Sequence, residues 1–140
     1  IIISFFKKMI SNEIIKIASN TRNVGLTNNY NYKSSLKNSM CGDKIKLELT
    51  FLNAKINSMR YETESCIYCE ASASLLSQKI KNLTIKEIIK NLNLFKIISI
   101  HQNLIFPDKF KEFRKLINKK HISRINCINL PLDAVLKALK

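Results

Sequence analysis

Glycine and proline are scarce in this chain, which has two of each among its 140 residues. The two glycines stand alone at positions 25 and 42, so the chain can form neither a glycine-rich phosphate loop nor a dinucleotide-binding turn. No run of 18 apolar residues occurs, and the sequence therefore predicts no membrane-spanning helix. The apolar stretch at residues 1–6 is too short for a secretory signal and its lysines follow it instead of preceding it, so we expect a cytoplasmic protein.

The chain has the length and the apolar content of one ordinary globular domain. Its residues are 46% hydrophobic and 24% charged. That is enough apolar material for one core, and it is not the composition of a disordered or collagen-like chain. We therefore predict a single domain over residues 1–140.

The charge is strongly positive, with 24 Lys and Arg against 10 Asp and Glu, which gives a net charge of +14. Such a charge can indicate a polyanionic partner. However, 20 of the 24 basic residues are lysines, whereas sites that read bases or grip phosphates favour arginine. Isoleucine, lysine and asparagine together also make up 58 of the 140 residues. We favour a compositionally biased, solvated surface and keep weak contact with nucleic acid or acidic proteins as the alternative.

Alternating hydrophobicity predicts antiparallel strands in the first half of the chain. The clearest strand covers residues 44–52 and carries four apolar side chains on one face: Ile45, Leu47, Leu49 and Phe51. A turn at residues 53–54 leads into a second strand over residues 55–62, whose weaker alternation indicates a bulge. The polar, turn-rich segment before the first strand has room for a third, short strand around Tyr30 and Tyr32.

Apolar residues at three- and four-residue spacings predict helices on both sides of these strands. We expect helices over residues 9–20 and 66–81, from residue 85, from Pro107, and from Cys127 or Pro131. The helix at 85 begins with a capping box of Thr84 and Glu87. On the last two helices, the side chains expected to face the core are Phe110, Phe113, Leu116, Ile117, Leu132, Val135, Leu136 and Leu139. Residues 94–106 show no clean periodicity, and the element order predicts an α+β fold.

Two of the four cysteines stand beside features that favour a reactive or metal-binding thiol. In a cytosolic chain, cysteines act as ligands or reactive thiols more often than as disulfides. Cys41 is followed by Gly42, which allows a tight turn, and by Asp43, whose carboxylate can point to the same place as the thiolate. Cys66 lies where the strand pattern becomes helical, so the positive end of a helix would ease its ionisation.

Cys127 lies at the expected start of the last helix and would gain the same help, with Arg124 one turn earlier adding positive charge. Three thiolates and one carboxylate suit a tetrahedral zinc or iron site. Its ligands would be Cys41, Asp43, Cys66 and Cys127. The alternative is that these cysteines are ordinary buried residues, since free cysteine is among the most buried types. The ligands are spread over 87 residues, and spacing alone leaves both interpretations open.

Cys69 and the two histidines are weaker candidates. Cys66 and Cys69 form a C-x-x-C sequence, but a helix places both on nearly one face, and Cys69 is more typical of a core residue than of a ligand. His101 and His121 are interpreted as surface or core residues and are left out of the site.

Three short blocks carry a more specific pattern. They read Met-Cys-Gly-Asp at residues 40–43, Glu-Ser-Cys-Ile-Tyr-Cys-Glu-Ala-Ser-Ala-Ser at residues 64–74 and Arg-Ile-Asn-Cys-Ile-Asn-Leu at residues 124–130. In this order they resemble the blocks of the NifU N-terminal family, whose members are iron–sulfur cluster assembly proteins of the IscU and SufU type. The resemblance covers residues 10–140 and implies a SufE/NifU-like fold, in which a small antiparallel sheet of about three strands packs against an N-terminal helix and several C-terminal helices.

The resemblance also implies roles for individual residues. Cys41, Asp43, Cys66 and Cys127 match the family's metal and cluster ligands, and Cys41 matches the sulfur acceptor of the SufU type. Cys41 and Arg124 are our candidate catalytic residues. The implied cofactors are zinc or iron and a transient 2Fe–2S cluster. The implied partners are a cysteine desulfurase, which holds pyridoxal phosphate, and downstream proteins that accept clusters.

Within the family the chain is more similar to the SufU type. Asn126 stands where the IscU type has a histidine before the third cysteine, and the stretch between the second and third ligand cysteines is long. Cys69 replaces a residue that is usually serine, which leaves a spare thiol within reach of the site.

The same four ligands serve either a zinc-dependent sulfur carrier or a cluster scaffold, and the sequence does not separate the two. Two other classes stay as alternatives. A basic module that binds nucleic acid or acidic proteins around a structural zinc would explain the charge, but it leaves the three blocks unexplained. A metal-dependent hydrolase would need an open zinc position and a general base, and no H-E-x-x-H motif is present.

Overall fold

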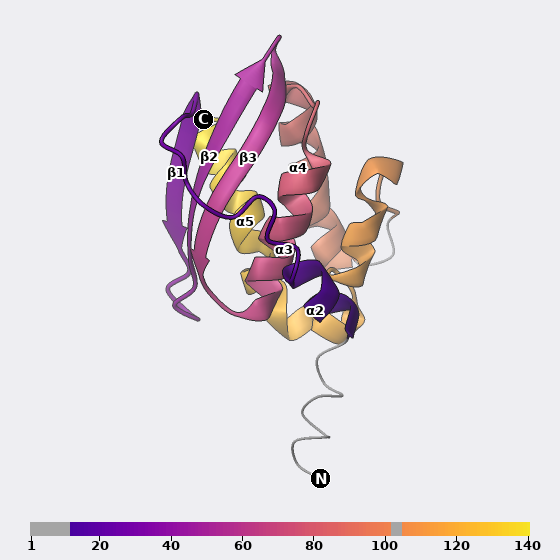
Figure 1. The fold of residues 1–140 in the computed structure, drawn as a ribbon. Coiled ribbons are helices and arrows are strands. Elements are labelled where there is room, and N and C mark those ends of the chain that lie inside the picture. The colour runs from indigo at the N-terminus through magenta and orange to yellow at the C-terminus, as the bar shows by residue number, and fades with distance from the viewer. Residues whose placement is uncertain (1–11, 102–104) are drawn as a thin grey trace.

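The structure is a computed structural model that describes residues 12–101 and 105–140, and it confirms the predicted α+β fold (Figure 1). The elements in chain order are α2 (Asn12–Ala18), β1 (Tyr32–Lys37), β2 (Lys44–Leu52), β3 (Lys55–Glu64), α3 (Ile67–Lys79), α4 (Ile85–His101), the 3₁₀ helices η1 (Asp108–Lys115) and η2 (Lys119–Arg124), and α5 (Ile125–Ala138). None of the helices in these two ranges has the length and apolar character needed to cross a membrane. Part of the predicted first helix, residues 9–11, lies outside the described residues.

The three strands form an antiparallel sheet in the order β1-β2-β3. The alternation in β2 buries the side chains of Ile45, Leu47 and Leu49, as predicted. β3 extends to Glu64, two residues beyond the predicted end. The predicted bulge is confirmed, because Thr50 pairs with Ser58 while the next residue of β2 pairs with Ile56, which leaves one residue of β3 unopposed.

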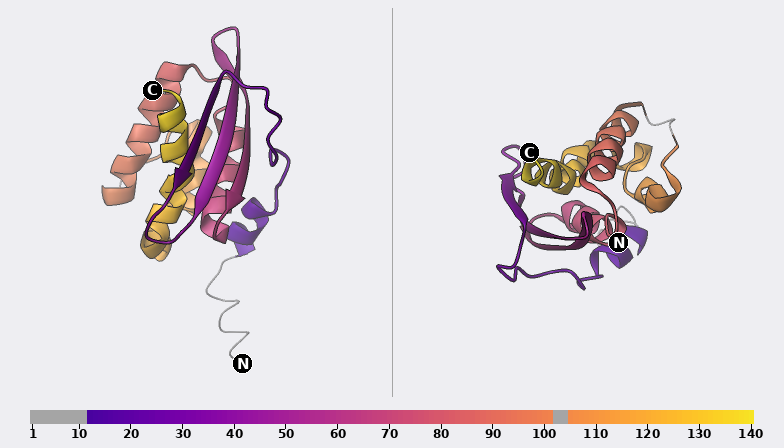
Figure 2. Two further views of the ribbon diagram at one scale, coloured as in Figure 1. Left: turned by 90° about the vertical axis from the view of Figure 1, so that its left-hand side faces the viewer. Right: turned by 90° about the horizontal axis from the view of Figure 1, so that it is seen from above.

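The helices cover one face of the sheet in two layers (Figure 2). α3 and α5 pack directly against the strands, α4 packs on α5, and η1 packs on α3. α3 is buried on nearly all sides, and its small residues let neighbours approach closely. Its buried hydroxyls are paired, since Ser72 Oγ donates to the carbonyl oxygen of Ile128 at 2.6 Å and Ser74 Oγ donates to that of Asn20 at 2.8 Å. An unpaired buried hydroxyl would cost about 1–3 kcal/mol.

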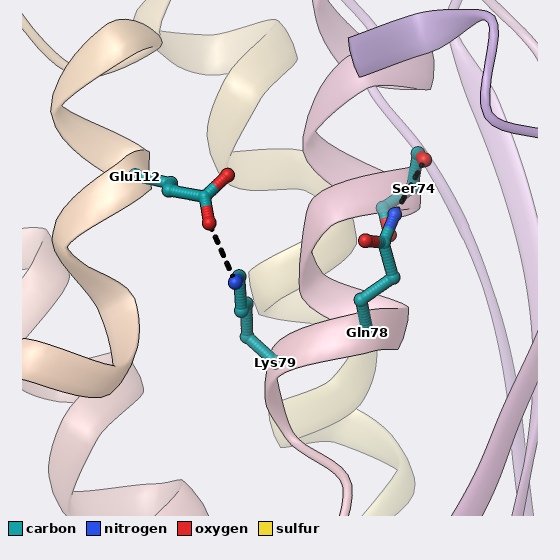
Figure 3. Close-up of polar contacts among 4 residues, drawn as sticks. All are labelled: Ser74, Gln78, Lys79 and Glu112. Atoms are coloured by element: carbon teal, nitrogen blue, oxygen red, sulfur yellow. Dashed lines mark hydrogen bonds and ion pairs between the residues drawn. The ribbon is translucent and has the colours of Figure 1, made fainter.

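The end of α3 is joined to η1 by an ion pair (Figure 3). Lys79 Nζ lies 2.7 Å from Glu112 Oε1, and this hydrogen bond lowers the pKa of the Glu112 carboxyl. At the residue before Lys79, the Gln78 side-chain amide donates to the carbonyl oxygen of Ser74, one turn earlier in α3, at 3.1 Å. Pairs of this exposed kind contribute at most about 1 kcal/mol, so they orient η1 more than they stabilise it.

The chain between α2 and β1 runs across the other face of the sheet. The Arg60 guanidinium donates to three backbone carbonyls within residues 22–25, and the Glu48 carboxylate accepts the backbone N–H groups of Thr27 and Asn28 at 2.7 and 2.9 Å. Glu48 is therefore only 4% exposed. Glu48 alternates with Leu47 and Leu49 and so lies on the face of the sheet opposite to theirs, where the crossing segment shields it from solvent.

The helices after α3 begin close to the predicted residues, but one of them is a 3₁₀ helix and not an α-helix. At the start of α4, Thr84 Oγ1 accepts the backbone N–H of Glu87 at 3.2 Å, which confirms the capping box. α4 continues through residues 94–101, which periodicity left unassigned. Residues 108–115 form a 3₁₀ helix, whose three-residue repeat turns Phe110 and Phe113 toward the buried ring of Phe95.

The last helix, α5, begins at Ile125, so the predicted starts at Cys127 and Pro131 are both late. Pro131 lies inside the helix, where it lacks the N–H that would bond to the carbonyl four residues earlier. Val135 and most other predicted core positions are buried, whereas Leu136 is only half-buried. The earlier start places Cys127 within the first turn of α5.

Candidate metal centre

Cys41 lies in the loop between β1 and β2. The backbone N–H of Asn38 donates to the carbonyl oxygen of Asp43, and the carbonyl oxygen of Asn38 accepts the N–H of Gly42, both at 2.8 Å. Gly42 has a φ of +76°, in the left-handed region that favours glycine, as expected for a tight turn. The loop thus leaves Cys41 exposed and buries Asp43 two residues later.

Asp43 connects this loop to the start of α3. Its Oδ1 accepts the backbone N–H of Cys66 at 3.2 Å, and its Oδ2 lies 3.4 Å from Cys66 Sγ. Cys66 is the N-cap residue of α3, which confirms its predicted place at the change from strand to helix. The carboxylate therefore lies at the positive end of a helix, which is favourable for a negative charge.

Cys127 reaches the same point from the first turn of α5. It is buried, and its Sγ lies 3.7 Å from Cys41 Sγ. The ligand atoms of Cys41, Asp43 and Cys127 lie within 4.8 Å of one another. Cys66 is not part of that group of three, but its sulfur contacts Asp43. The fold thus brings together four side chains from the loop, the start of α3 and the start of α5.

The distances between these atoms suit a tetrahedral metal site. Zinc binds a thiolate sulfur at about 2.3 Å and a carboxylate oxygen at about 2.0–2.2 Å, so tetrahedral angles separate two sulfurs by about 3.8 Å and a sulfur from an oxygen by about 3.5 Å. The structure has 3.7 Å between the sulfurs of Cys41 and Cys127. It has 3.4 Å between Cys66 Sγ and the nearer oxygen of Asp43. The donors of Cys41, Asp43 and Cys127 therefore suit a zinc or iron ion, and Cys66 could join them through its contact with Asp43.

The ionisation of Cys127 differs from the expectation drawn from the sequence. Burial, followed by the neighbouring thiols of Cys66 and Cys41, raises the pKa of the Cys127 thiol well above its usual value. Burial and the neighbouring thiols thus oppose the help that was expected from the start of the last helix. A cation at the centre of the four ligands would reverse the balance, since a coordinating thiol is deprotonated.

Arg124 lies three residues before Cys127 and contacts Tyr68. As the N-cap residue of α5 it is exposed, and its guanidinium lies over the ring of Tyr68, 5.7 Å from the ring centroid. The ring of His121 packs against Tyr68 at 5.3 Å, and His121 Nδ1 lies 3.0 Å from the carbonyl oxygen of Leu116. Sequence analysis missed Tyr68, whose place two residues after Cys66 was the only signal.

Cys69 is completely buried in α3, as predicted for a core residue. Burial raises the pKa of its thiol from 9.0 to about 12. Because the folded chain favours the protonated thiol, the resulting stability is fully present below pH 9 and is lost as the pH rises toward 12.

We expect Cys69→Ala to make the free energy of unfolding less sensitive to alkaline pH. Between pH 9 and 12 the unfolded chain releases the Cys69 proton while the folded chain keeps it. This difference lowers the free energy of unfolding by up to about 1.4 kcal/mol per pH unit. Chemical denaturation at several pH values in this range would measure both slopes. Equal slopes for the parent protein and the variant would contradict the assignment.

Comparison with known families identifies the family of this chain. The family model described as NifU-like N terminal domain matches residues 9–140. The chain belongs to this family. The resemblance drawn from the three sequence blocks is thus confirmed over nearly the whole chain.

The relatives of this chain include proteins of both the IscU type and the SufU type. The chain is 28% identical over 142 residues to the iron–sulfur cluster assembly scaffold protein IscU of Thermotoga maritima, and the match covers 96% of this chain and 95% of that protein. It is 34% identical over 80 residues to the zinc-dependent sulfurtransferase SufU of Bacillus subtilis, with 57% of this chain and 52% of that protein covered.

Solved structures share the fold. A nitrogen-fixing NifU-like protein (N-terminal) from Brucella abortus has a TM-score of 0.82 at 16% identity, covering 96% of this chain and 94% of that one. A putative iron–sulfur cluster assembly scaffold protein for the SUF system from Fervidobacterium islandicum has a TM-score of 0.80 at 22% identity, covering 95% of this chain and 98% of that one.

Proposed function

We propose that this protein is an iron–sulfur cluster assembly protein of the SufU/IscU type that accepts persulfide sulfur from a cysteine desulfurase. The observation that carries the proposal is the close group formed by Cys41, Asp43 and Cys127, with the sulfur of Cys66 in contact with Asp43. Family membership supports it, because the named relatives include a cluster assembly scaffold and a zinc-dependent sulfurtransferase.

In this proposal Cys41, Asp43, Cys66 and Cys127 are the ligands of zinc or iron. A bound zinc ion would keep the thiolates deprotonated without redox chemistry of its own. Asp43 and Cys66 already orient each other through two contacts, and Cys127 is anchored in the first turn of α5. These three residues therefore form the fixed part of the ligand set.

Cys41 is the nucleophile of the proposed transfer, because it is the exposed thiol and lies on a loop. Its thiolate attacks the outer sulfur of the persulfide on the desulfurase. A sulfur–sulfur bond forms at Cys41 while the bond in the donor persulfide breaks, and the donor cysteine leaves as a thiolate. The step therefore needs neither oxidant nor reductant. Arg124 supplies positive charge at the exposed edge of the site, and pyridoxal phosphate belongs to the desulfurase.

The scaffold version of this function uses the same residues. Cys41, Cys66, Cys127 and Asp43 would hold a transient 2Fe–2S cluster as cargo, and the carboxylate ligand would make that cluster easier to pass on to an acceptor protein. We favour the SufU version, because Asn126 stands where the IscU type has a histidine before the third cysteine.

Metal analysis of anaerobically purified protein tests the proposal. Zinc at one ion per chain without acid-labile sulfide is expected for the sulfur carrier. Iron together with acid-labile sulfide is expected for the scaffold. If the chain takes up neither zinc nor a reconstituted cluster, the proposed site is wrong.

The positive charge leads to a separate prediction about nucleic acid. We expect binding to duplex DNA to be weak, independent of sequence and abolished by roughly 0.2 M salt, as for phosphate contacts alone. Fluorescence anisotropy with two unrelated labelled duplexes at increasing salt would measure this. Nanomolar binding that discriminates between the duplexes at that salt would favour the basic nucleic-acid module instead.

A further inference from the structure

The first turn of α3 holds two cysteines. Cys66 is the N-cap residue and Cys69 is the third residue of the helix. α-Carbons three residues apart in a helix are separated by about 5 Å, which is inside the range of about 4.4–6.8 Å that a disulfide spans. Side chains at the N-cap and third positions also meet in the capping box, so a short rotation is enough to bring two thiols together at these places.

The two thiols differ in exposure. Cys66 is partly exposed, whereas Cys69 is completely buried beneath it. The side chain of Cys66 makes no capping hydrogen bond to α3, and its sulfur lies instead against Asp43. A reagent in solution therefore meets Cys66 first, and Cys69 can reach that sulfur only from inside the protein.

The remaining two thiols are already neighbours, with 3.7 Å between the sulfurs of Cys41 and Cys127. Four cysteines allow three pairings. Cys127 also lies beside Cys66, so it is the places of Cys66 and Cys69 in the first turn of α3 that point to the pairing of Cys66 with Cys69 and of Cys41 with Cys127.

We propose that Cys66 and Cys69 form a redox-active pair that closes into a disulfide and thereby removes Cys66 from Asp43. Pairing depends only on the first turn of α3. Its consequence, the loss of one ligand from the metal site, rests on the proposed function.

The oxidant in this proposal is a low-molecular-weight disulfide such as oxidised glutathione. The thiolate of Cys66 attacks one sulfur of the reagent, forms a mixed disulfide with it and releases the other half as a thiolate. The Cys69 thiol then attacks Cys66 Sγ and gives up its proton to a solvent base as the sulfur–sulfur bond forms, and the second half of the reagent leaves as a thiolate. One reagent disulfide is reduced to two thiols, two protein thiols are oxidised, and their two protons pass through solvent to the released thiolates.

Tryptic peptides make the test simple, because cleavage after Arg60 and Lys79 leaves Cys66 and Cys69 together in residues 61–79. Cys41 lies in residues 38–44 and Cys127 in residues 125–137. The full chain is treated with a chelator, oxidised with oxidised glutathione, alkylated and analysed by mass spectrometry. We expect residues 61–79 to be lighter by two hydrogen atoms, without alkylation or glutathione.

The matched control is Cys69→Ser, which keeps Cys66 but removes the thiol that would displace glutathione. In this variant we expect residues 61–79 to keep one glutathione. If the parent protein also keeps glutathione on Cys66, or if Cys66 is linked to the peptide of Cys41 or Cys127 while Cys69 stays reduced, the proposed pair is wrong. Because metal is absent throughout, this outcome is independent of the metal analysis that tests the proposed function.

Discussion

Replacing Cys66 and Cys127 together by alanine is expected to abolish tight metal binding while the chain stays folded. The double variant loses two of four donors, and the remaining Cys41 and Asp43 cannot enclose a tetrahedral ion. Loss of an outer-shell partner alone costs 10–100-fold in metal affinity, so we expect loss of two ligands to exceed about 100-fold. Elemental analysis after gel filtration measures bound zinc and iron, and far-ultraviolet circular dichroism reports the fold.

The matched control for the double variant is Cys69→Ser. Cys69 lies in the same turn as Cys66 but is outside the four ligands, so this variant is expected to keep its metal. Stoichiometric metal in the double variant would refute the ligand set. Loss of metal in Cys69→Ser would show that a C-x-x-C site within α3 has taken its place.

Cys41→Ala is expected to abolish stimulation of a cognate cysteine desulfurase. The variant removes the nucleophile, and the exposed position of Cys41 means that the free energy of unfolding should change by no more than about 0.5 kcal/mol. Sulfide release from cysteine in the presence of a reductant measures the stimulation. Ser39→Ala, in the same exposed loop, is the control and should stimulate as the parent protein does. Full stimulation by Cys41→Ala would contradict the assignment of Cys41 as acceptor.

The sequence predicted those elements whose form depends on neighbouring residues in the chain. Period-two alternation identified β2, and the capping box of Thr84 and Glu87 fixed the start of α4. The 3₁₀ form of residues 108–115 could not be predicted, because it depends on where Phe110 and Phe113 meet Phe95 from another helix. Residues 94–101 were unassigned because further apolar residues such as Leu94 and Ile97 hide the helical spacing of the buried side chains Leu92, Phe95 and Ile98.

For the candidate site too, the sequence predicted the residues but not the effects of contacts between distant segments. The sequence blocks predicted four ligands, and the structure groups the ligand atoms of Cys41, Asp43 and Cys127 with Cys66 in contact with Asp43. Burial could not be deduced, so the raised pKa of Cys127 was unexpected. The contact of Arg124 with Tyr68 was also hidden, because it joins segments 56 residues apart in the sequence. Such effects come from residues that are distant in the chain, which a local pattern does not encode.

The most direct test locates the transferred sulfur. The full-length chain is incubated with a cysteine desulfurase and cysteine under anaerobic conditions, digested with trypsin and analysed by mass spectrometry. We predict added sulfur on residues 38–44, whose one cysteine is Cys41, and none on residues 61–79 or 125–137. Added sulfur on either of the latter two peptides, with Cys41 unmodified, would contradict the proposed sulfur acceptor.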